Sequence, residues 1–411
     1  MDRARFCPAQ SPGRQGGLSA QNRRTGLDFT LNKEHQQIKQ TVKDFVKGEF
    51  KKEIIHDLLN TTAYPEKIWK KAGDLGFLGI HFPEAYSGEG LGMFEKILIV
   101  EGLATGDSSV GACLGLAGSG TEMLLRHGDE PLKKTWLPQV ADATHLSAYA
   151  LMEPASGSNG EHIKTTAILK HHSWVINGTK TFVLNGGPRT GFYIVLCRTS
   201  PEQGTSIKGL SILLVPADTK GITRMDMGKR IGYELLDICQ VQFKDVEVPF
   251  SNLIGKAGNG YEQTRDIFNH ACLLFAALAL GTAQGAFERS FAHVRQRTQF
   301  GKKIIDFQNT RHKIASMATD IEMARLMLYQ GALSCENNQK GDTKHCHMAK
   351  LIACRTAMQV CDSAIQLLGG YGYIREYDVE RFYRDAKMAE LLGGNTHTLK
   401  NAIAETLIGK G

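Results

Sequence analysis

The stretch that decides the fold reads Gln366-Leu-Leu-Gly-Gly-Tyr-Gly-Tyr-Ile-Arg-Glu-Tyr-Asp-Val-Glu-Arg-Phe-Tyr-Arg-Asp-Ala-Lys387, and Leu391-Leu-Gly-Gly-Asn-Thr-His-Thr-Leu-Lys400 follows it. Its first Gly-Gly pair follows an amphipathic helical pattern over residues 343–368, and glycine is a common way for a helix to end. A second helical pattern covers residues 379–392. The stretch therefore joins two helices through a glycine-rich loop and ends in another.

Composition indicates a globular protein. The chain has 411 residues, 42% hydrophobic and 22% charged, which is enough for two or three domains that share cores. No apolar run approaches the ~20 residues that span a bilayer, so we expect a soluble protein with no membrane partner. The net charge of +7 is not organised as a basic, aromatic-interleaved patch, so nucleic acid is not an expected partner. An acidic ligand such as a nucleotide or coenzyme A suits the charge.

The N-terminus and the cysteines bear on localisation. Residues 1–26 carry five arginines against a single acid, Asp2, but prolines and glycines interrupt any amphipathic helix there. We expect residues 1–28 to form a disordered basic tail of a cytoplasmic protein, with the mitochondrial matrix as the alternative if the tail is a transit peptide. The nine scattered cysteines indicate free thiols in a reducing compartment. His345-Cys346-His347 cannot converge on one ion from a helix, so no metal site is expected.

Hydrophobic patterning divides the rest of the chain into three domains. Helical spacing of apolar residues covers residues 29–144 and returns in long patterns through residues 251–411. Residues 145–250 instead show short β-branched and aromatic runs, separated by turn signals such as Asn177-Gly178 and Gly186-Gly187-Pro188. The expected helices cover residues 31–50, 65–75, 93–105, 119–126, 133–140, 262–295, 310–336, 343–368 and 379–392. The expected strands include residues 174–176, 192–197, 210–215 and 238–243. The architecture is thus an N-terminal helical block, a central small β domain and a C-terminal four-helix bundle.

The motifs are similar to those of the flavin-dependent acyl-CoA dehydrogenases, in family order over residues 29–410. The opening stretch resembles the family's Q-[IL]-L-G-G-x-G-[YF] and R-D-A-K segments. The resemblance implies an acyl-CoA dehydrogenase-like fold, FAD as cofactor, an acyl-CoA substrate and an electron-transferring flavoprotein as electron acceptor. It also implies a homotetramer, or at least a dimer, because this family shares its flavin across subunits.

Two segments resemble the family's surroundings of the flavin ring. Residues 149–159 resemble Y-x-x-T-E-P-x-A-G-S-D, and residues 177–186 resemble N-G-x-K-x-[WF]-I-[TS]-N-[GA]. The resemblance assigns Leu151, Met152, Phe182 and Leu184 to the ring and Ser158 to the phosphate region of flavin and CoA. Met152 and Leu184 replace hydroxyl residues, and each lost hydrogen bond is worth ~1 kcal/mol. An altered flavin potential or a weakened flavin site is therefore implied.

Other segments resemble the dinucleotide end of the site. Arg297-Thr-Gln-Phe-Gly-Lys-Lys-Ile304 resembles a family segment that contacts the pyrophosphate from a neighbouring subunit, and a guanidinium is a natural fork for a diphosphate. The resemblance assigns this end to Arg297, Phe300, Gln366, Gly369 and Gly370. In the loop that closes over the flavin, Asn395 and His397 replace a threonine and an acidic or amide residue.

The family's glutamate base is absent from both of its usual positions. In the family, a carboxylate removes the α-proton of an acyl thioester while the β-hydrogen leaves as hydride to the flavin. Gly393 stands at the first position, and a gapless reading places Ala271 at the second, followed by Cys272. The N–H of Gly393 still suits the thioester carbonyl, which makes Ser158 and Gly393 the expected substrate-binding residues. His270 is a candidate for a relocated base, although it lies about 100° around the helix from Ala271.

Three functions remain open. The first is an acyl-CoA dehydrogenase with a non-standard base, for which Glu95, Glu101 and Asp107 are further acids near the acyl pocket; Glu101 and Asp107 also suit helix-face and capping roles. The second is an acyl-CoA-site flavoenzyme of reductase or desulfinase type, and the third a non-catalytic subunit of a heteromeric dehydrogenase. A binding protein without flavin is the alternative outside catalysis. Small side chains along the expected pocket wall favour a bulky, branched or cyclic acyl group: Gly102, Gly106, Gly111, Ala112, Gly115 and Ala117.

Overall fold

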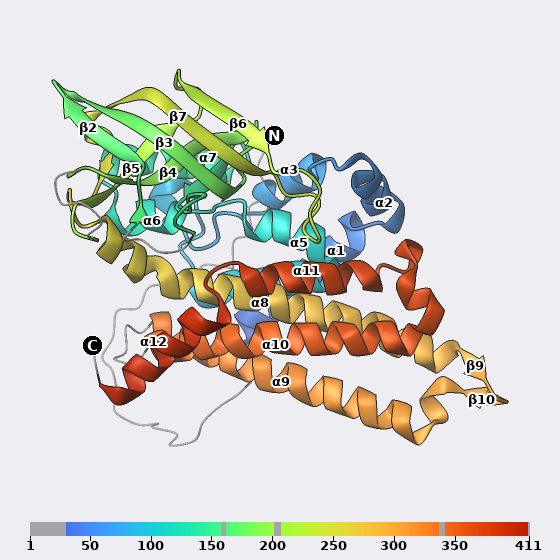
Figure 1. The fold of residues 1–411 in the computed structure, drawn as a ribbon. Helices are drawn as coiled ribbons and strands as arrows, with labels where there is room; N and C mark the ends of the chain where they lie inside the picture. The colour runs from blue at the N-terminus through green and yellow to red at the C-terminus, as the bar shows by residue number, and fades with distance from the viewer. Residues whose placement is uncertain (1–29, 158–161, 201–206, 337–341, 410–411) are drawn as a thin grey trace, which may run out of the picture.

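The computed structural model describes residues 30–157, 162–200, 207–336 and 342–409. Figure 1 shows short helices, a twisted sheet and a set of long helices that lie side by side beneath the sheet. This order confirms the expected helical block, β domain and helical bundle. The tail expected over residues 1–28 lies outside the described residues.

The N-terminal domain consists of α1 (Lys33–Glu49), α2 (Lys52–Thr61), α3 (Glu66–Asp74), α4 (Met93–Gly106), α5 (Ser108–Gly115), α6 (Thr121–His127) and α7 (Glu130–Ala141). Asn32 caps α1, because its side chain accepts a hydrogen bond from the N–H of His35. Asp107 caps α5 through the N–H of Val110, as its capping role predicts. The sequence did not predict α5, whose serines and glycines are weak helix formers, so burial stabilises it.

The central domain is an eight-stranded sheet of β1 (Leu146–Ala150), β2 (Thr166–Lys170), β3 (Ser173–Leu184), β4 (Thr190–Arg198), β5 (Leu210–Pro216), β6 (Ile222–Asp226), β7 (Ile238–Pro249) and β8 (Leu253–Ile254). The strand order is β6-β7-β3-β2-β4-β5-β8, and β1 pairs with β4 in parallel. Alternate residues of β4 serve two cores: Phe192 and Ile194 pack with α6 and α7, whereas Tyr193 and Val195 pack with β3 and β7. The sheet is therefore buried on both faces at its centre.

One expectation about this domain is wrong. Asn177-Gly178 is not a turn but lies within β3, where the register against β7 shifts between Ile176 and Gly178. The Asn177 side chain holds this bulge by accepting from the N–H of Asp245 and donating to the Asp245 carboxylate. The sheet also includes the two-residue strand β8, which pairs with β5.

The C-terminal domain contains α8 (Gly260–Gln296), α9 (Gln308–Glu336), α10 (Asp342–Leu368), α11 (Val379–Leu391) and α12 (Thr396–Ile408). A hairpin of β9 (Thr298–Gln299) and β10 (Lys302–Lys303) connects α8 to α9 and protrudes from the far end of the bundle (Figure 1). Within the described residues, α8 alone is long and apolar enough to cross a membrane, but 72% of its apolar window is buried inside the protein. Its apolar residues pack against α4, α9, α10 and α11.

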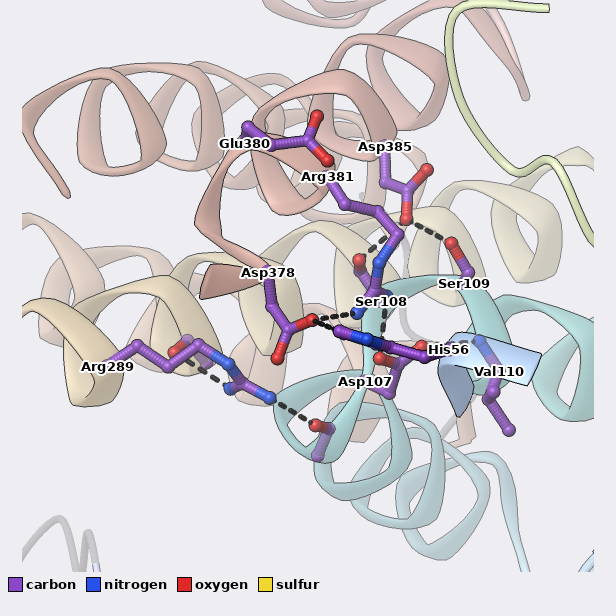
Figure 2. A network of polar contacts seen from close by, with 12 residues as sticks. His56, Asp107, Ser108, Ser109, Val110, Arg289, Asp378, Glu380, Arg381 and Asp385 are labelled. Atoms are coloured by element: carbon purple, nitrogen blue, oxygen red, sulfur yellow. Dashed lines mark hydrogen bonds and ion pairs between the residues drawn. The ribbon is translucent and has the colours of Figure 1, made fainter. Parts of the chain in front are cut away.

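The Arg-Asp-Ala-Lys segment on α11 joins the three domains (Figure 2). Asp385 accepts hydrogen bonds from the hydroxyls of Ser108 and Ser109 on α5, each at 2.6 Å, and from the N–H of Tyr233 between β6 and β7, also at 2.6 Å. Arg384 donates to the carbonyl of Ile231 at 2.9 Å. Because α11, α5 and the loop between β6 and β7 belong to different domains, this segment fixes their relative positions.

A buried ion pair supports the same junction. Arg381 on α11 is 2.6 Å from the Asp107 carboxylate, and both side chains are almost fully buried. Arg381 also pairs with Asp378, which accepts from His56 of α2 (Figure 2). Burial lowers the pKa of Arg381, but the surrounding carboxylates outweigh it and raise that pKa, so the guanidinium stays charged.

Candidate functional site

A cavity of about 650 Å³ lies where the ends of α8 and α10 meet the start of α9. It brings together four of the five residues expected at the dinucleotide end: Arg297, Gln366, Gly369 and Gly370. Gly369 has a φ of +60°, and no atom lies within 4 Å of a Cβ added at Gly369 or Gly370, so both backbones face open space. A phosphate group can approach this backbone closely.

The cavity is electropositive. Arg297 and Lys313 line it, and no carboxylate pairs with either of them in the described part of the chain. The guanidinium of Arg297 lies 5.6 Å from the centre of the Tyr371 ring, which leaves its N–H groups available. Burial and the charge of Arg297 lower the pKa of His293, so this side chain is neutral at physiological pH. Two cations beside an open glycine backbone fit a diphosphate.

Phe300, the fifth expected residue, is not part of the cavity. It lies at the tip of the β9–β10 hairpin with a φ of +52° and is 92% exposed. Its ring makes an edge contact with the Phe307 ring, with the ring centres 6.4 Å apart, and most of its surface faces solvent. Its position suits contact with a second copy.

The residues expected at the flavin ring lie in the β domain. Lys180 of β3 donates to the carbonyl of Leu151 at 3.0 Å and to Glu153 at 2.9 Å, and the N–H of Thr181 donates to the carbonyl of Met152 at 2.9 Å. Glu153 also accepts from the N–H groups of Lys164 and Thr165. Burial raises the pKa of Glu153, but Lys180 and these donors outweigh it and lower that pKa. The strand therefore holds the segment after β1 through a buried ion pair.

A bulge in β3 presents Phe182 to solvent. The register against β7 shifts between Lys180 and Val183, and Phe182 has a φ of +50° and is 48% exposed. Leu184 is half-buried and packs against the helical core. An exposed ring on a rigid strand suits stacking against an aromatic ligand. Ser158 lies outside the described residues.

These two groups lie in different parts of one chain. Figure 1 shows β3 in the sheet, whereas the cavity adjoins β9 and β10 at the far end of the bundle. The ring residues and the dinucleotide cavity are therefore carried by different domains of the chain.

The loop at Gly393 is built for glycine. Gly393 has a φ of +65°, and a Cβ added there would overlap the ring of Phe275 on α8. The next residue, Gly394, has a φ of +96°, and its Cβ would lie 2.7 Å from the Phe268 ring. Two aromatic rings of α8 thus fill the space beside this loop, and a glutamate at position 393 does not fit without repacking.

The second base position also offers no proton acceptor. Ala271 is half-buried, and the Sγ of the next residue, Cys272, lies 3.8 Å from the carbonyl oxygen of Gly393, to which it donates. Burial raises the pKa of the Cys272 thiol to about 12, so it remains protonated. Neither position can take up a proton at physiological pH.

His270 faces away from this loop. Its Nε2 lies 3.4 Å from Glu122 on α6 and 3.7 Å from the Sγ of Cys335 on α9. Burial lowers the pKa of His270, but Cys335 and Glu122 outweigh it and raise that pKa. A hydrogen bond from Cys346 lowers the pKa of Cys335 to about 5 against the effect of burial. His270 thus belongs to a charged cluster between helices, and its contacts do not support a role as base.

The other expected residues have structural partners. Glu101 is buried between Arg325 at 3.0 Å and Tyr329 at 2.8 Å. Glu95 completes the capping box of α4 and contacts His35. The Asn395 side chain caps α12 by accepting from the N–H groups of His397 and Thr398, and the His397 side chain is exposed. Asn395 is therefore occupied by its own helix.

Sequence reasoning missed several residues of the site. His293 lies one helical turn before Arg297, and that spacing could have identified it. Lys313 lies in the second turn of α9, after the motif ends. Phe275 carried no signal, because an apolar residue on a core helix is ordinary. The His345-Cys346-His347 segment packs instead: the Sγ of Cys346 lies 3.6 Å from the carbonyl oxygen of Gly331, and His347 lies against Phe268. The described residues contain no group of three or more metal-ligating side chains.

Comparison with known proteins gives consistent matches. Family profiles match as acyl-CoA dehydrogenase N-terminal domain over residues 32–144, middle domain over 148–246 and C-terminal domain over 258–408. The chain is 35% identical over 383 residues to the probable acyl-CoA dehydrogenase YngJ of Bacillus subtilis, covering 93% of this chain and 100% of that protein. It is 32% identical over 384 residues to acryloyl-CoA reductase (NADH) of Anaerotignum propionicum, and the match covers 93% of this chain and 96% of that protein.

A solved structure described as "Electron transferring flavoprotein of Acidaminococcus fermentans: Towards a mechanism of flavin-based electron bifurcation" superposes with a TM-score of 0.88 at 32% identity, covering 93% of this chain and 100% of that one. The matched domains are those of FAD-dependent flavoproteins that act as oxidoreductases on CH–CH bonds of acyl-CoA. With three consecutive domain matches and relatives aligned over nearly their full length, the chain belongs to the acyl-CoA dehydrogenase family.

Proposed function

We propose that this protein is a FAD-dependent acyl-CoA dehydrogenase that oxidises an acyl-CoA thioester to the enoyl-CoA without a glutamate at either usual base position. The observation that carries the proposal is the electropositive cavity of Arg297, Lys313, Gln366, Gly369 and Gly370, which fits the dinucleotide end of FAD. A branched, cyclic or otherwise substituted acyl group is part of the proposal. So is an electron-transferring flavoprotein as electron acceptor.

Each part of the chain has a defined task in this proposal. Bound FAD supplies a two-electron acceptor for the hydride that leaves the β-carbon. Arg297 and Lys313 neutralise its diphosphate, and the backbone of Gly369 and Gly370 lets the phosphates approach. The segment of Leu151 and Met152, held by Lys180, borders the ring together with Phe182 and Leu184. The N–H of Gly393 polarises the thioester carbonyl and acidifies the α-carbon.

The proton acceptor is a group other than residues 393 and 271. Phe275 fills the volume beside Gly393, and Cys272 is a neutral thiol, so the loop polarises the substrate but does not deprotonate it. This packing also favours a second candidate, an acyl-CoA-site flavoenzyme of reductase or desulfinase type. The reductase relative from Anaerotignum propionicum adds to that support.

An oligomer in which two copies share each flavin is also part of the proposal. The ring residues and the dinucleotide cavity lie in different parts of the chain, so a complete site needs both ends from two chains. A third candidate, a non-catalytic subunit of a heteromeric dehydrogenase, rests on the same arrangement. We further propose a reducing compartment such as the cytoplasm, since the eight cysteines with described structure are buried free thiols.

The visible spectrum of the purified protein tests the function. We expect a yellow protein whose flavin band bleaches anaerobically when one member of a panel of straight, branched and cyclic acyl-CoA thioesters is added. A yellow protein that no thioester reduces contradicts the dehydrogenase and favours the reductase or desulfinase type. A colourless protein that still forms oligomers contradicts both and favours the non-catalytic subunit or a binding protein.

A further inference from the structure

A buried lysine on α10 holds the loop that carries Gly393. We propose that Lys350, together with Cys272, is a positioning residue that orients the backbone of residues 390–394 so that the N–H of Gly393 is free to bind the thioester carbonyl. The inference deepens the proposed function and rests on it for the identity of the ligand. The evidence is the bonding and burial of Lys350.

Lys350 is a buried cation without an acidic partner. It is 1% exposed, and no carboxylate lies within ion-pair distance of it in the described part of the chain. Its Nζ donates instead to the carbonyl of Gly394 at 2.8 Å and to the carbonyl of Glu390 at 3.3 Å. Burying an ammonium group against carbonyls alone is costly, so a core position normally holds an apolar residue. A lysine in this place needs a specific role.

The two acceptors of Lys350 flank the loop. Glu390 lies in the last turn of α11, and Gly394 lies one residue after Gly393. A single ammonium group therefore ties the end of the helix to the far side of the loop. Since glycines at positions 393 and 394 leave the backbone conformationally free, an outside tether has to supply the order that side chains would otherwise give.

Cys272 holds the middle of the loop from α8. Its Sγ donates to the carbonyl of Gly393 at 3.8 Å, and the thiol stays protonated as this bond requires. The carbonyls of Glu390, Gly393 and Gly394 are thus all bound from the protein interior. Among the described hydrogen bonds the N–H of Gly393 has no acceptor, so it remains available to a ligand.

The same arrangement explains why the loop keeps its function without a carboxylate. A backbone N–H stabilises a developing enolate only if it is held in place before the reaction. Phe268 and Phe275 of α8 limit the loop by packing, and Lys350 of α10 limits it by hydrogen bonds. Loss of the ammonium group is expected to loosen the loop without emptying the flavin cavity at the other end of α10.

Hydrogen exchange of the flavin-bound oligomer tests the positioning. In Lys350→Met we expect amides of residues 390–395 to exchange about tenfold faster or more, while residues 343–368 of α10 exchange as in the parent. Lys350→Arg, which keeps a cationic donor, is expected to restore most of the protection. Lys387→Met is the matched control, because Lys387 bonds the side chain of Glu390 on the exposed face of α11. Unchanged exchange in the loop, or faster exchange along all of α10, overturns the proposal.

Thioester binding separates this inference from the proposed function. Butyryl-CoA and isobutyryl-CoA, titrated calorimetrically, are expected to bind Lys350→Met several-fold more weakly than the parent, with flavin content unchanged. If the variant has a loose loop but binds both thioesters like the parent, the loop is tethered but does not serve the substrate, and the proposal is wrong. If the parent binds neither thioester, the proposed function fails, while the exchange result still decides whether Lys350 holds the loop.

Discussion

Gly393 and Phe275 show how one residue pair decides what a site can do. The ring of Phe275 occupies the volume that a side chain at position 393 needs, and the φ of +65° disfavours any residue but glycine. A glutamate at position 393 would therefore require Phe275 to move or to be replaced as well. The residue that excludes it lies more than a hundred positions earlier in the chain.

Gly393→Glu is expected to destabilise the protein by about 2–5 kcal/mol, from the positive φ and the overlap with Phe275 together. Gly258→Glu is the matched control: it also has a positive φ, +85°, but no atom lies within 4 Å of an added Cβ. It is expected to lose only about 1–2 kcal/mol. Adding Phe275→Ala to Gly393→Glu is expected to lose about 1 kcal/mol less than the sum of the single changes, because the two sites compete for one volume. Urea unfolding measures the parent, the three single variants and the double variant, and equal losses for both glycine variants would contradict the packing argument.

At the scale of elements, most helices could be predicted and several strands could not. The pattern over residues 93–105 matches α4, and that over 379–392 matches α11, because apolar residues at helical spacing have to reach a common core. The prediction of a turn at Asn177-Gly178 was wrong. The dipeptide is typical of a hairpin turn, but here the hydrogen bonds between Asn177 and Asp245 hold it as a bulge within β3. That partner is distant in sequence, so local propensity cannot reveal it.

The candidate site was predictable to the extent that its motifs are local. Arg297 and Gln366 are separated by most of two helices, yet family order placed both at the dinucleotide end, and the structure brings them into one cavity. His270 shows the limit: a sequence gives its distance from Ala271 along the helix, but not that Glu122 and Cys335 surround it. The contacts of His270 with α6 and α9, which the sequence does not reveal, are what argue against its role as base.

Asp385 holds α11 against α5 and the loop between β6 and β7. Asp385→Ala leaves the hydroxyls of Ser108 and Ser109 and the N–H of Tyr233 without their acceptor. Each buried unsatisfied donor costs about 1–3 kcal/mol, so the total loss is expected to exceed ~3 kcal/mol. Burial raises the pKa of Asp385 despite Arg381 and the three donors, which shows that its charge is costly there. Asp385→Asn, which removes the charge and keeps one acceptor oxygen, is therefore expected to lose less.

Urea unfolding compares these variants with Asp362→Ala, whose side chain is exposed on α10. The control is expected to stay within about 0.5 kcal/mol of the parent. A loss for Asp385→Ala no larger than that of the control would show that the segment joining the three domains is held by other contacts, such as the Arg381–Asp107 ion pair.

At the scale of the whole molecule, the ring residues and the dinucleotide cavity lie in different domains of the chain, and this separation is the basis of the proposal that two copies share each flavin. Arg297 lines the cavity next to β9, and Phe182 is an exposed residue of β3. Figure 1 shows β3 in the sheet and β9 at the far end of the bundle. Both side chains are exposed, so changing either leaves the core intact. Arg297→Ala removes a cation from the dinucleotide end, and Phe182→Asp places a charge at the ring end in a conformation that aspartate tolerates. We expect each variant alone to purify as an oligomer with little flavin.

Co-expression of the two variants then distinguishes a shared site from a site within one chain. In a hybrid pair, the intact ring end of the Arg297→Ala chain meets the intact dinucleotide end of the Phe182→Asp chain, and the other site has both defects. Random pairing is therefore expected to restore flavin to roughly a quarter of all sites. A site confined to one chain cannot recover, because every chain carries one defect. Flavin absorbance per chain, with light scattering to confirm the oligomer, measures the outcome; no recovery, or a monomeric parent at micromolar concentration, would refute the shared site.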